Sequence, residues 1–95
     1  MPKNPYRSEV GIIKAILRAI TEHGNPGIVL SSVARIANLS HYMTKEKCEK
    51  LSDAGLIDYQ HDSGRRLIVI TERGLEISRE IQHFTEIAQS INIRC

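Results

Sequence analysis

A chain of 95 residues, of which 41% are hydrophobic and 25% charged, has the composition of one small globular domain. No stretch approaches the roughly 20 consecutive apolar residues of a membrane span, and the first ten residues lack the apolar core of a secretory signal. We therefore expect a cytoplasmic protein with no membrane partner. The formal net charge of +2 does not by itself indicate a polyanion partner. Residues 1–71, however, hold ten Lys and Arg against seven Asp and Glu, whereas residues 72–95 hold three against four.

The first predicted helix covers residues 9–23. Ser8 is a candidate N-cap, because its hydroxyl can accept a hydrogen bond from a free backbone N–H of the first turn. Apolar residues then recur at i, i+3, i+4 and i+7, the spacing of one buried helical face: Ile13, Ile16, Leu17 and Ile20. A turn rich in Gly and Pro, residues 23–27, separates this helix from the next element.

Two shorter helices are predicted at residues 30–37 and 41–54, joined by a tight turn. Asn38 tolerates a left-handed conformation in that turn, and Ser40 can cap the second of the two helices. The apolar period of the first is Leu30, Val33, Ala34 and Ala37; the second buries Thr44, Cys48 and Leu51. Gly55 fits a left-handed C-terminal cap.

The pattern then changes to two β-rich runs, residues 56–60 and 65–70. They flank Asp62-Ser63-Gly64 and predict a hairpin. A last helix opens with Thr71 as candidate N-cap and Glu72 in the first turn, where the helix dipole favours an acid. Its apolar residues follow a heptad spacing of +4, +3, +4 and +3, which predicts a coiled-coil seam over residues 75–93: Ile77, Ile81, Phe84, Ala88 and Ile91. The alternative is that this stripe folds back on the first helix.

The predicted fold class is mainly α with a β-hairpin, and the order of three helices, a hairpin and a long helix is typical of a winged helix-turn-helix. Three segments carry a closer likeness: Ala37-Asn38-Leu39-Ser40, Ala54-Gly55-Leu56-Ile57 and Leu67-Ile68-Val69-Ile70-Thr71-Glu72-Arg73-Gly74. Through them the chain resembles archaeal winged helix-turn-helix DNA-binding proteins over residues 8–91. It is most similar to the small chromatin-type dimers with a C-terminal antiparallel coiled coil.

The resemblance implies a DNA-binding domain at residues 1–73 and a dimerisation helix at residues 74–95. It implies a homodimer that binds double-stranded DNA, acts as a transcription regulator or an architectural chromatin protein, and is associated with the nucleoid. The DNA-binding residues that we expect from the resemblance lie at the start and along the helix at 41–54 and on the wing: Ser40, His41, Tyr42, Lys45, Lys47, Lys50, Arg65 and Arg66. Glu46 and Glu49 dilute the positive charge of that helix.

Residue chemistry supports part of this surface. On a helical wheel, Tyr42 and Lys45 point away from the buried set of their helix, together with Glu46 and Glu49. Alternation along a strand sends Arg65 and Arg66 to opposite faces, so at most one enters a minor groove. The alternative for one of them is an ion pair with Asp58 or Asp62 across the hairpin.

Other classes of function find no support in the sequence. The four histidines, at positions 23, 41, 61 and 83, lack the spacing of a metal site. Cys48 and Cys95 form no disulfide framework, and we expect a core residue and a terminal thiol. No catalytic motif is present, so we expect neither an enzyme nor a cofactor nor a small-molecule substrate. The competing hypothesis is a winged helix that binds another protein and not DNA.

Overall fold

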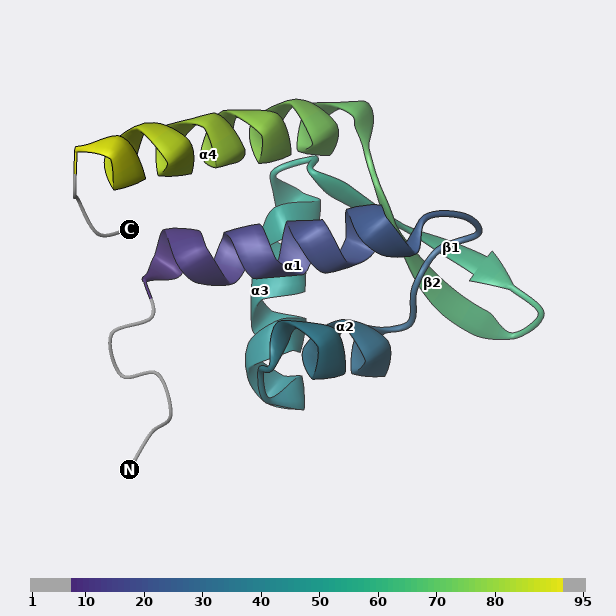
Figure 1. The fold of residues 1–95 in the computed structure, drawn as a ribbon. Coiled ribbons are helices and arrows are strands. Elements are labelled where there is room, and N and C mark those ends of the chain that lie inside the picture. The colour runs from purple at the N-terminus through teal and green to yellow at the C-terminus, as the bar shows by residue number, and fades with distance from the viewer. Residues whose placement is uncertain (1–7, 92–95) are drawn as a thin grey trace.

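The computed structural model describes residues 8–91, which form helices on both sides of a central helix and a hairpin that projects from the body (Figure 1). The elements are, in chain order, α1 (Glu9–His23), α2 (Leu30–Ala37), α3 (His41–Asp53), β1 (Ile57–Asp62), β2 (Arg65–Ile70) and α4 (Glu72–Ser90). The predicted order, and the helix starts, are confirmed, and the mainly α fold with an antiparallel hairpin is the expected one.

Local capping explains where three of the helices begin. The hydroxyl oxygen of Ser8 accepts a hydrogen bond from Gly11 N at 2.9 Å, that of Ser40 accepts one from Met43 N at 3.0 Å, and that of Thr71 accepts one from Gly74 N at 2.9 Å. Each bond satisfies a backbone donor that has no partner within its own helix. All three N-caps predicted from the sequence are therefore confirmed.

The hairpin has a two-residue turn whose central residues, Ser63 and Gly64, have φ values of 53° and 80°. Two positive φ values define the type I′ turn, which matches the twist of the paired strands. The antiparallel register runs from Ile57 opposite Ile70 to Asp62 opposite Arg65. The sequence did not predict that residue 28 adds a bridge to β2: Ile28 and Ile68 exchange backbone hydrogen bonds of 3.0 and 2.8 Å.

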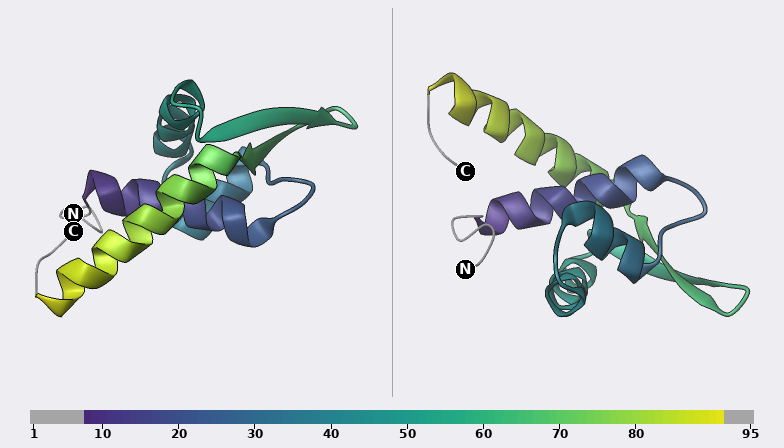
Figure 2. Two further views of the ribbon diagram at one scale, coloured as in Figure 1. Left: turned by 90° about the horizontal axis from the view of Figure 1, so that it is seen from above. Right: turned by 60° about the horizontal axis from the view of Figure 1, so that its bottom comes forward.

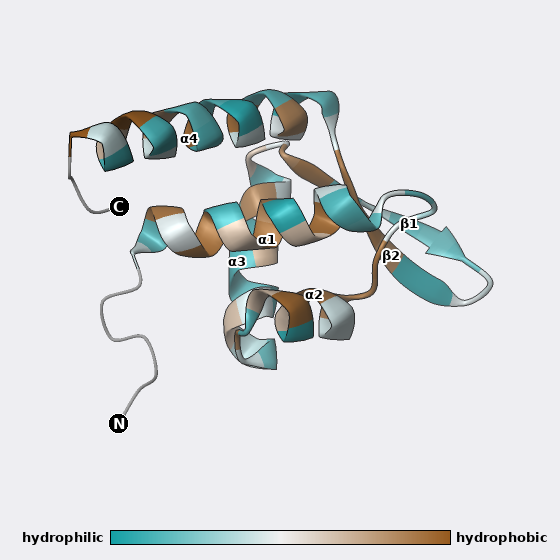
Figure 3. Ribbon diagram, in the orientation of Figure 1, coloured by the Kyte–Doolittle hydropathy of each residue, from teal (hydrophilic) through white to brown (hydrophobic). Residues whose placement is uncertain are grey.

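Helix α1 lies at the centre of the hydrophobic core. Its residues Ile16 and Leu17 are fully buried, and α2, α3, β2 and α4 all pack against this helix. Hydropathy drawn on the ribbon is hydrophobic where the hairpin joins the helices and hydrophilic at its far end (Figure 3). The base of the hairpin is therefore fixed to the core while its tip is left to solvent.

Helix α4 crosses α1 (Figure 2), and its first turn lies close to the residues at the base of the hairpin. Gly74 is buried there, against the backbone of Leu56 and the side chain of Ile70. Farther along α4, Ile77 and Ile81 are half-buried against the core. The second half of the helix buries Thr85 and Ala88.

The apolar stripe of α4 is therefore covered along one edge and exposed along the other, a division that the sequence pattern did not predict. Ala88 is 2% exposed and belongs to the interior of its own chain, as in the alternative that the stripe folds back. Phe84, Ile87 and Ile91 remain 54%, 46% and 60% exposed. The described α4 has 19 residues, and the predicted extension of the seam to residue 93 lies partly outside the described residues.

Within residues 8–91, no helix combines the length and apolar character needed to cross a membrane. Cys48 is fully buried, as predicted, and burial raises the pKa of its thiol to about 11. A thiol that is both inaccessible and protonated at neutral pH is a poor nucleophile. Cys95 lies outside the described residues.

Gly74→Ala tests the close approach of the first turn of α4 to Leu56 and Ile70. A Cβ at this position would overlap the carbonyl oxygen of Leu56 and lie 2.7 Å from Ile70 Cγ1. Such overpacking costs about 1–3 kcal/mol, so we expect the melting temperature to fall by roughly 5 to 20 °C. Ser31→Ala, in the exposed first turn of α2, is the control and should change it little. A Gly74→Ala variant as stable as the parent would contradict the close approach.

Candidate nucleic-acid interface

The tight turn between α2 and α3 sets the direction of α3. Asn38 adopts the predicted left-handed conformation, with φ 58° and ψ 51°, and Ser40 then begins α3 as its N-cap. His41 and Tyr42 follow in the first turn and are exposed, Tyr42 by 76%. The start of α3 thus presents an imidazole and a phenol to solvent, as the sequence predicted.

Charge on the exposed side of α3 is mixed. Lys45 and Lys50 are both exposed, but five residues of helix separate them by roughly 140° around its axis. Glu46 and Glu49 lie between them. The positive charge of Lys50 helps lower the pKa of Glu9 on α1, so this lysine lies on the flank of α3 that faces the start of α1. Lys45 lies on the other flank.

Lys47 does not belong to this surface, and its placement among the DNA-binding residues is corrected. Its side chain is only 10% exposed, and Lys47 Nζ donates a hydrogen bond to Glu9 Oε2 at 2.7 Å. The hydrogen bond that this ammonium donates to the Glu9 carboxylate lowers the pKa of Glu9 and raises the pKa of Lys47. The pair joins α3 to the start of α1, and nothing in the local pattern around either residue indicates it.

The two arginines of the wing have different surroundings. Arg65 opens β2 opposite Asp62. Arg66 lies on the other face, with its Cζ 3.8 Å from the centroid of the Tyr59 ring. The ion pairs of residues 8–91 are Arg18–Glu22 and Lys47–Glu9, so the alternative that a wing arginine pairs with Asp58 or Asp62 is not realised.

A small cleft lies between α3 and the wing, with a volume of about 110 Å³. Its lining residues come from α2, α3 and both strands: Leu30, Lys45, Glu49, Tyr59, Arg66 and Ile68. Tyr59 was not predicted as a site residue. The turn could have revealed it, because the register set by a two-residue turn at residues 63–64 makes Tyr59 a diagonal neighbour of Arg66.

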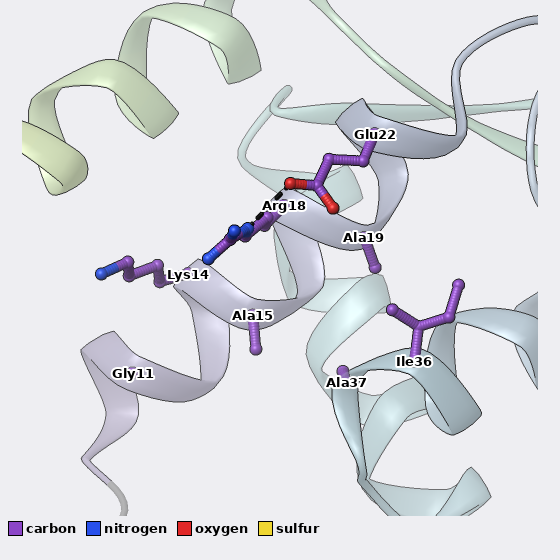
Figure 4. Close-up of a pocket in the computed structure, with 8 residues that line it drawn as sticks. All are labelled: Gly11, Lys14, Ala15, Arg18, Ala19, Glu22, Ile36 and Ala37. Atoms are coloured by element: carbon purple, nitrogen blue, oxygen red, sulfur yellow. Dashed lines mark hydrogen bonds and ion pairs between the residues drawn. The ribbon is translucent and has the colours of Figure 1, made fainter.

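A second groove runs between α1 and α2 and holds about 340 Å³ (Figure 4). Small residues form its floor, Ile36 projects from α2, and Lys14 and the Arg18–Glu22 ion pair lie along α1. Its lining contains neither a histidine nor a cysteine nor a hydroxyl side chain. In the part of the chain that the structure describes, no group of three or more His, Cys, Asp or Glu could hold a metal ion.

Three helices, the third following a tight turn, and a hairpin that extends beside that third helix define the winged helix class of proteins. The sequence matches the winged helix-turn-helix family over residues 6–89, and the chain belongs to this family. No similar sequence is found among the curated proteins.

Solved structures share the fold at low sequence identity. Sso10a-2, a DNA-binding protein from Sulfolobus solfataricus, is 21% identical, with a TM-score of 0.80 over 90% of this chain and 86% of its own. The transcriptional regulator PcaV from Streptomyces coelicolor, solved with its natural ligand, is 24% identical, with a TM-score of 0.77 over 90% of this chain and 61% of its own. MepR, a transcription regulator of the Staphylococcus aureus multidrug efflux pump MepA, is 20% identical, with a TM-score of 0.72 over 84% of this chain and 61% of its own. The chain thus spans about three fifths of the length of these two regulators.

Glu9→Gln tests the ion pair that holds α3 against α1. Because the pKa of Glu9 is lowered in the folded protein, its carboxylate stabilises the fold above the ordinary value of 4.5, and that contribution is lost as the pH falls. We expect the variant to melt a few degrees below the parent at neutral pH. The two melting curves should converge well below pH 4.5.

Glu22→Gln is the matched control for this experiment, since it removes a carboxylate from an exposed pair on the same helix. It should leave the melting temperature nearly unchanged at every pH. A Glu9→Gln variant that melts with the parent at neutral pH would contradict a stabilising role for the pair.

Proposed function

We propose that this protein binds double-stranded DNA as a homodimer, with α3 in the major groove and the wing along the backbone. Its role would be that of a transcription regulator or an architectural, nucleoid-associated protein, without catalytic activity. The proposal divides the chain into a DNA-binding part at residues 1–73 and a dimerisation helix at residues 74–95.

The observation that carries the proposal is the meeting of cations from two separate elements. Lys45 of α3 and Arg66 of the wing line the same cleft, and Arg65 lies exposed on the adjoining strand end. Backbone phosphates of a duplex are bound by such side chains, which fix the register of the protein on DNA. A recognition helix and a wing that reach the same backbone supply that arrangement.

The exposed start of α3 provides the groove-facing groups. His41 and Tyr42 can reach base edges or phosphates from the first turn, where unpaired N–H groups and the positive end of the helix dipole favour an anion. Ser40 contributes by capping α3, because its hydroxyl oxygen already accepts a hydrogen bond from Met43 N. Lys50 reaches the duplex from the far flank of α3. Lys47 is left out of the proposed surface.

Related structures support the proposal by analogy. Sso10a-2 is described as a DNA-binding protein, PcaV and MepR as regulators of transcription, and a MepR variant was solved bound to an oligodeoxyribonucleotide. The competing function, binding of another protein through α3, is favoured by Glu46 and Glu49 in the middle of its exposed face. Duplex binding distinguishes the two functions.

The proposed dimer uses the exposed apolar face of α4. Phe84, Ile87 and Ile91 are spaced at +3 and +4 and adjoin the half-buried Ile77 and Ile81. Covering an apolar side chain of this size is worth about 1.5–3 kcal/mol, so three such residues on each of two chains favour association. Ala88 is already buried in the single chain and is therefore left out of the interface. A two-fold axis would pair each face with its copy.

DNA binding is tested by Lys45→Ala combined with Arg65→Ala. A short fluorescein-labelled duplex of mixed sequence, titrated over a series of salt concentrations, should bind the parent with an affinity that falls steeply with salt. The double variant should bind more weakly, whatever the sequence of the duplex. The slope of its affinity against salt concentration should be shallower by the contribution of about two phosphate contacts. Absence of duplex binding by the parent at low salt would contradict the proposal and favour the protein-binding alternative.

The matched control removes two positive charges from other elements, Lys14 on α1 and Arg79 on α4, by Lys14→Ala and Arg79→Ala. It changes the net charge by the same amount. Its salt slope should stay that of the parent. Equal losses in the two double variants would mean that overall charge, and not the proposed surface, controls binding.

Dimerisation is tested by Phe84→Glu, with Gln89→Glu as the control on the opposite side of α4, where the side chain is also exposed. The first substitution places a charge from each chain in the proposed interface, where its desolvation is unfavourable. Sedimentation of Phe84→Glu should show a monomer at micromolar concentration, whereas Gln89→Glu should sediment as the parent dimer. A monomeric parent, or a dimeric Phe84→Glu variant, would contradict an interface on this face.

A further inference from the structure

Arg66 is held against an aromatic ring and not against a carboxylate. Its Cζ lies 3.8 Å from the centroid of Tyr59, within the range of a cation–π interaction. Tyr59 lies opposite Ile68 in the hairpin, which makes Arg66 its diagonal neighbour on the same face. Neither ion pair of residues 8–91 involves Arg66.

The Tyr59 ring is itself fixed by packing. It is half-buried against the hydrophobic core, and this burial raises the pKa of its hydroxyl, an effect that the nearby Arg66 guanidinium partly offsets. Arg66, in contrast, is exposed. The ring is therefore an anchored platform beneath a side chain that would otherwise sample many rotamers.

The stacked guanidinium lines the cleft between α3 and the wing together with Lys45. These two cations come from different elements, and the cleft of about 110 Å³ between them has the scale of a small polyatomic group. Stacking uses the face of a guanidinium and leaves the N–H groups along its edge free to donate to an oxyanion. Glu49 also lines the cleft and opposes an anion there.

We infer that this cleft seats one phosphate of the DNA backbone, bound by Lys45 and Arg66, and that Tyr59 is the positioning residue that holds Arg66 in place. The inference rests on the proposed DNA binding and assigns a specific contact within it. Arg65, on the opposite face of β2 and not stacked on a ring, is outside this seat.

The first experiment compares Tyr59→Leu with Tyr59→Phe, using the labelled duplex over a salt series. Phe keeps the ring and should bind DNA nearly as the parent does. Leu removes the platform, so Arg66 must be ordered during binding, and the affinity should fall by about three- to tenfold. The salt slope of Tyr59→Leu should stay that of the parent because the charge is retained, whereas Arg66→Ala should make it shallower by about one contact.

A double-mutant cycle separates positioning from a merely structural role. In an Arg66→Ala background, Tyr59→Leu should cause no further loss of affinity, because there is no guanidinium left to position. An equal loss in both backgrounds would show that the ring acts through the fold alone and would overturn the assignment.

Arg66→Lys keeps the inference testable if Tyr59→Leu fails to fold, since Arg66 is exposed. Lysine keeps the charge but lacks the planar group that stacks, so we expect a loss of about three- to tenfold at an unchanged salt slope. Arg65→Lys is the matched control and should bind as the parent does. Parental affinity of Arg66→Lys would overturn the seat while leaving the proposed DNA binding intact, whereas a parent that does not bind duplex would overturn both.

Discussion

Burial of α1 is the constraint on which the rest of the structure depends. Ile16 and Leu17 have no exposed surface, and four other elements pack around this one helix. Burial of a side chain of this size stabilises the fold by about 1.5–3 kcal/mol, and a chain this short has few other sources of stability. Because α3 and β2 share the same buried partner, their relative position is set by the core.

That shared core has a consequence for the surface. Two elements anchored to one helix hold their exposed side chains at a fixed separation, so Lys45 on α3 and Arg66 on the wing meet at one cleft. The Lys47–Glu9 pair adds a polar link between α3 and α1 at the other side of the same helix. A cation is thus used inside the domain to fix α3, which leaves fewer on the surface to bind a polyanion. In the proposed DNA complex, the positions of a few charges would therefore matter more than their number.

Helix α4 combines two roles that the sequence pattern does not separate. Its first turns are fixed to the body at Gly74, and its second half keeps Thr85 and Ala88 inside while Phe84, Ile87 and Ile91 face solvent. Thr85 is accommodated in the interior because its hydroxyl donates to the carbonyl of Ile81 at 2.8 Å. A helix of this kind can stabilise its own domain and still offer an apolar face for self-association.

The sequence by itself determined the secondary structure, because the signals that start and end each element are local. Capping by Ser8, Ser40 and Thr71 and the left-handed turn at Asn38 each depend on a few neighbouring residues, and all of them were predicted. The exposure of Tyr42 at the start of α3 was also predicted from the sequence, because helical periodicity places this side chain away from the buried face.

Only the tertiary structure decided which polar and apolar side chains are available to a partner. Lys47 and Lys50 belong to the same helix, yet one is buried against Glu9, 38 positions earlier, and the other is exposed. Ala88 and Ile91 share one predicted heptad seam, yet Ala88 is 2% exposed and Ile91 is 60% exposed. The choice rests in each case on contacts between segments far apart in the chain, and a periodic pattern along one helix holds no information about what packs against it.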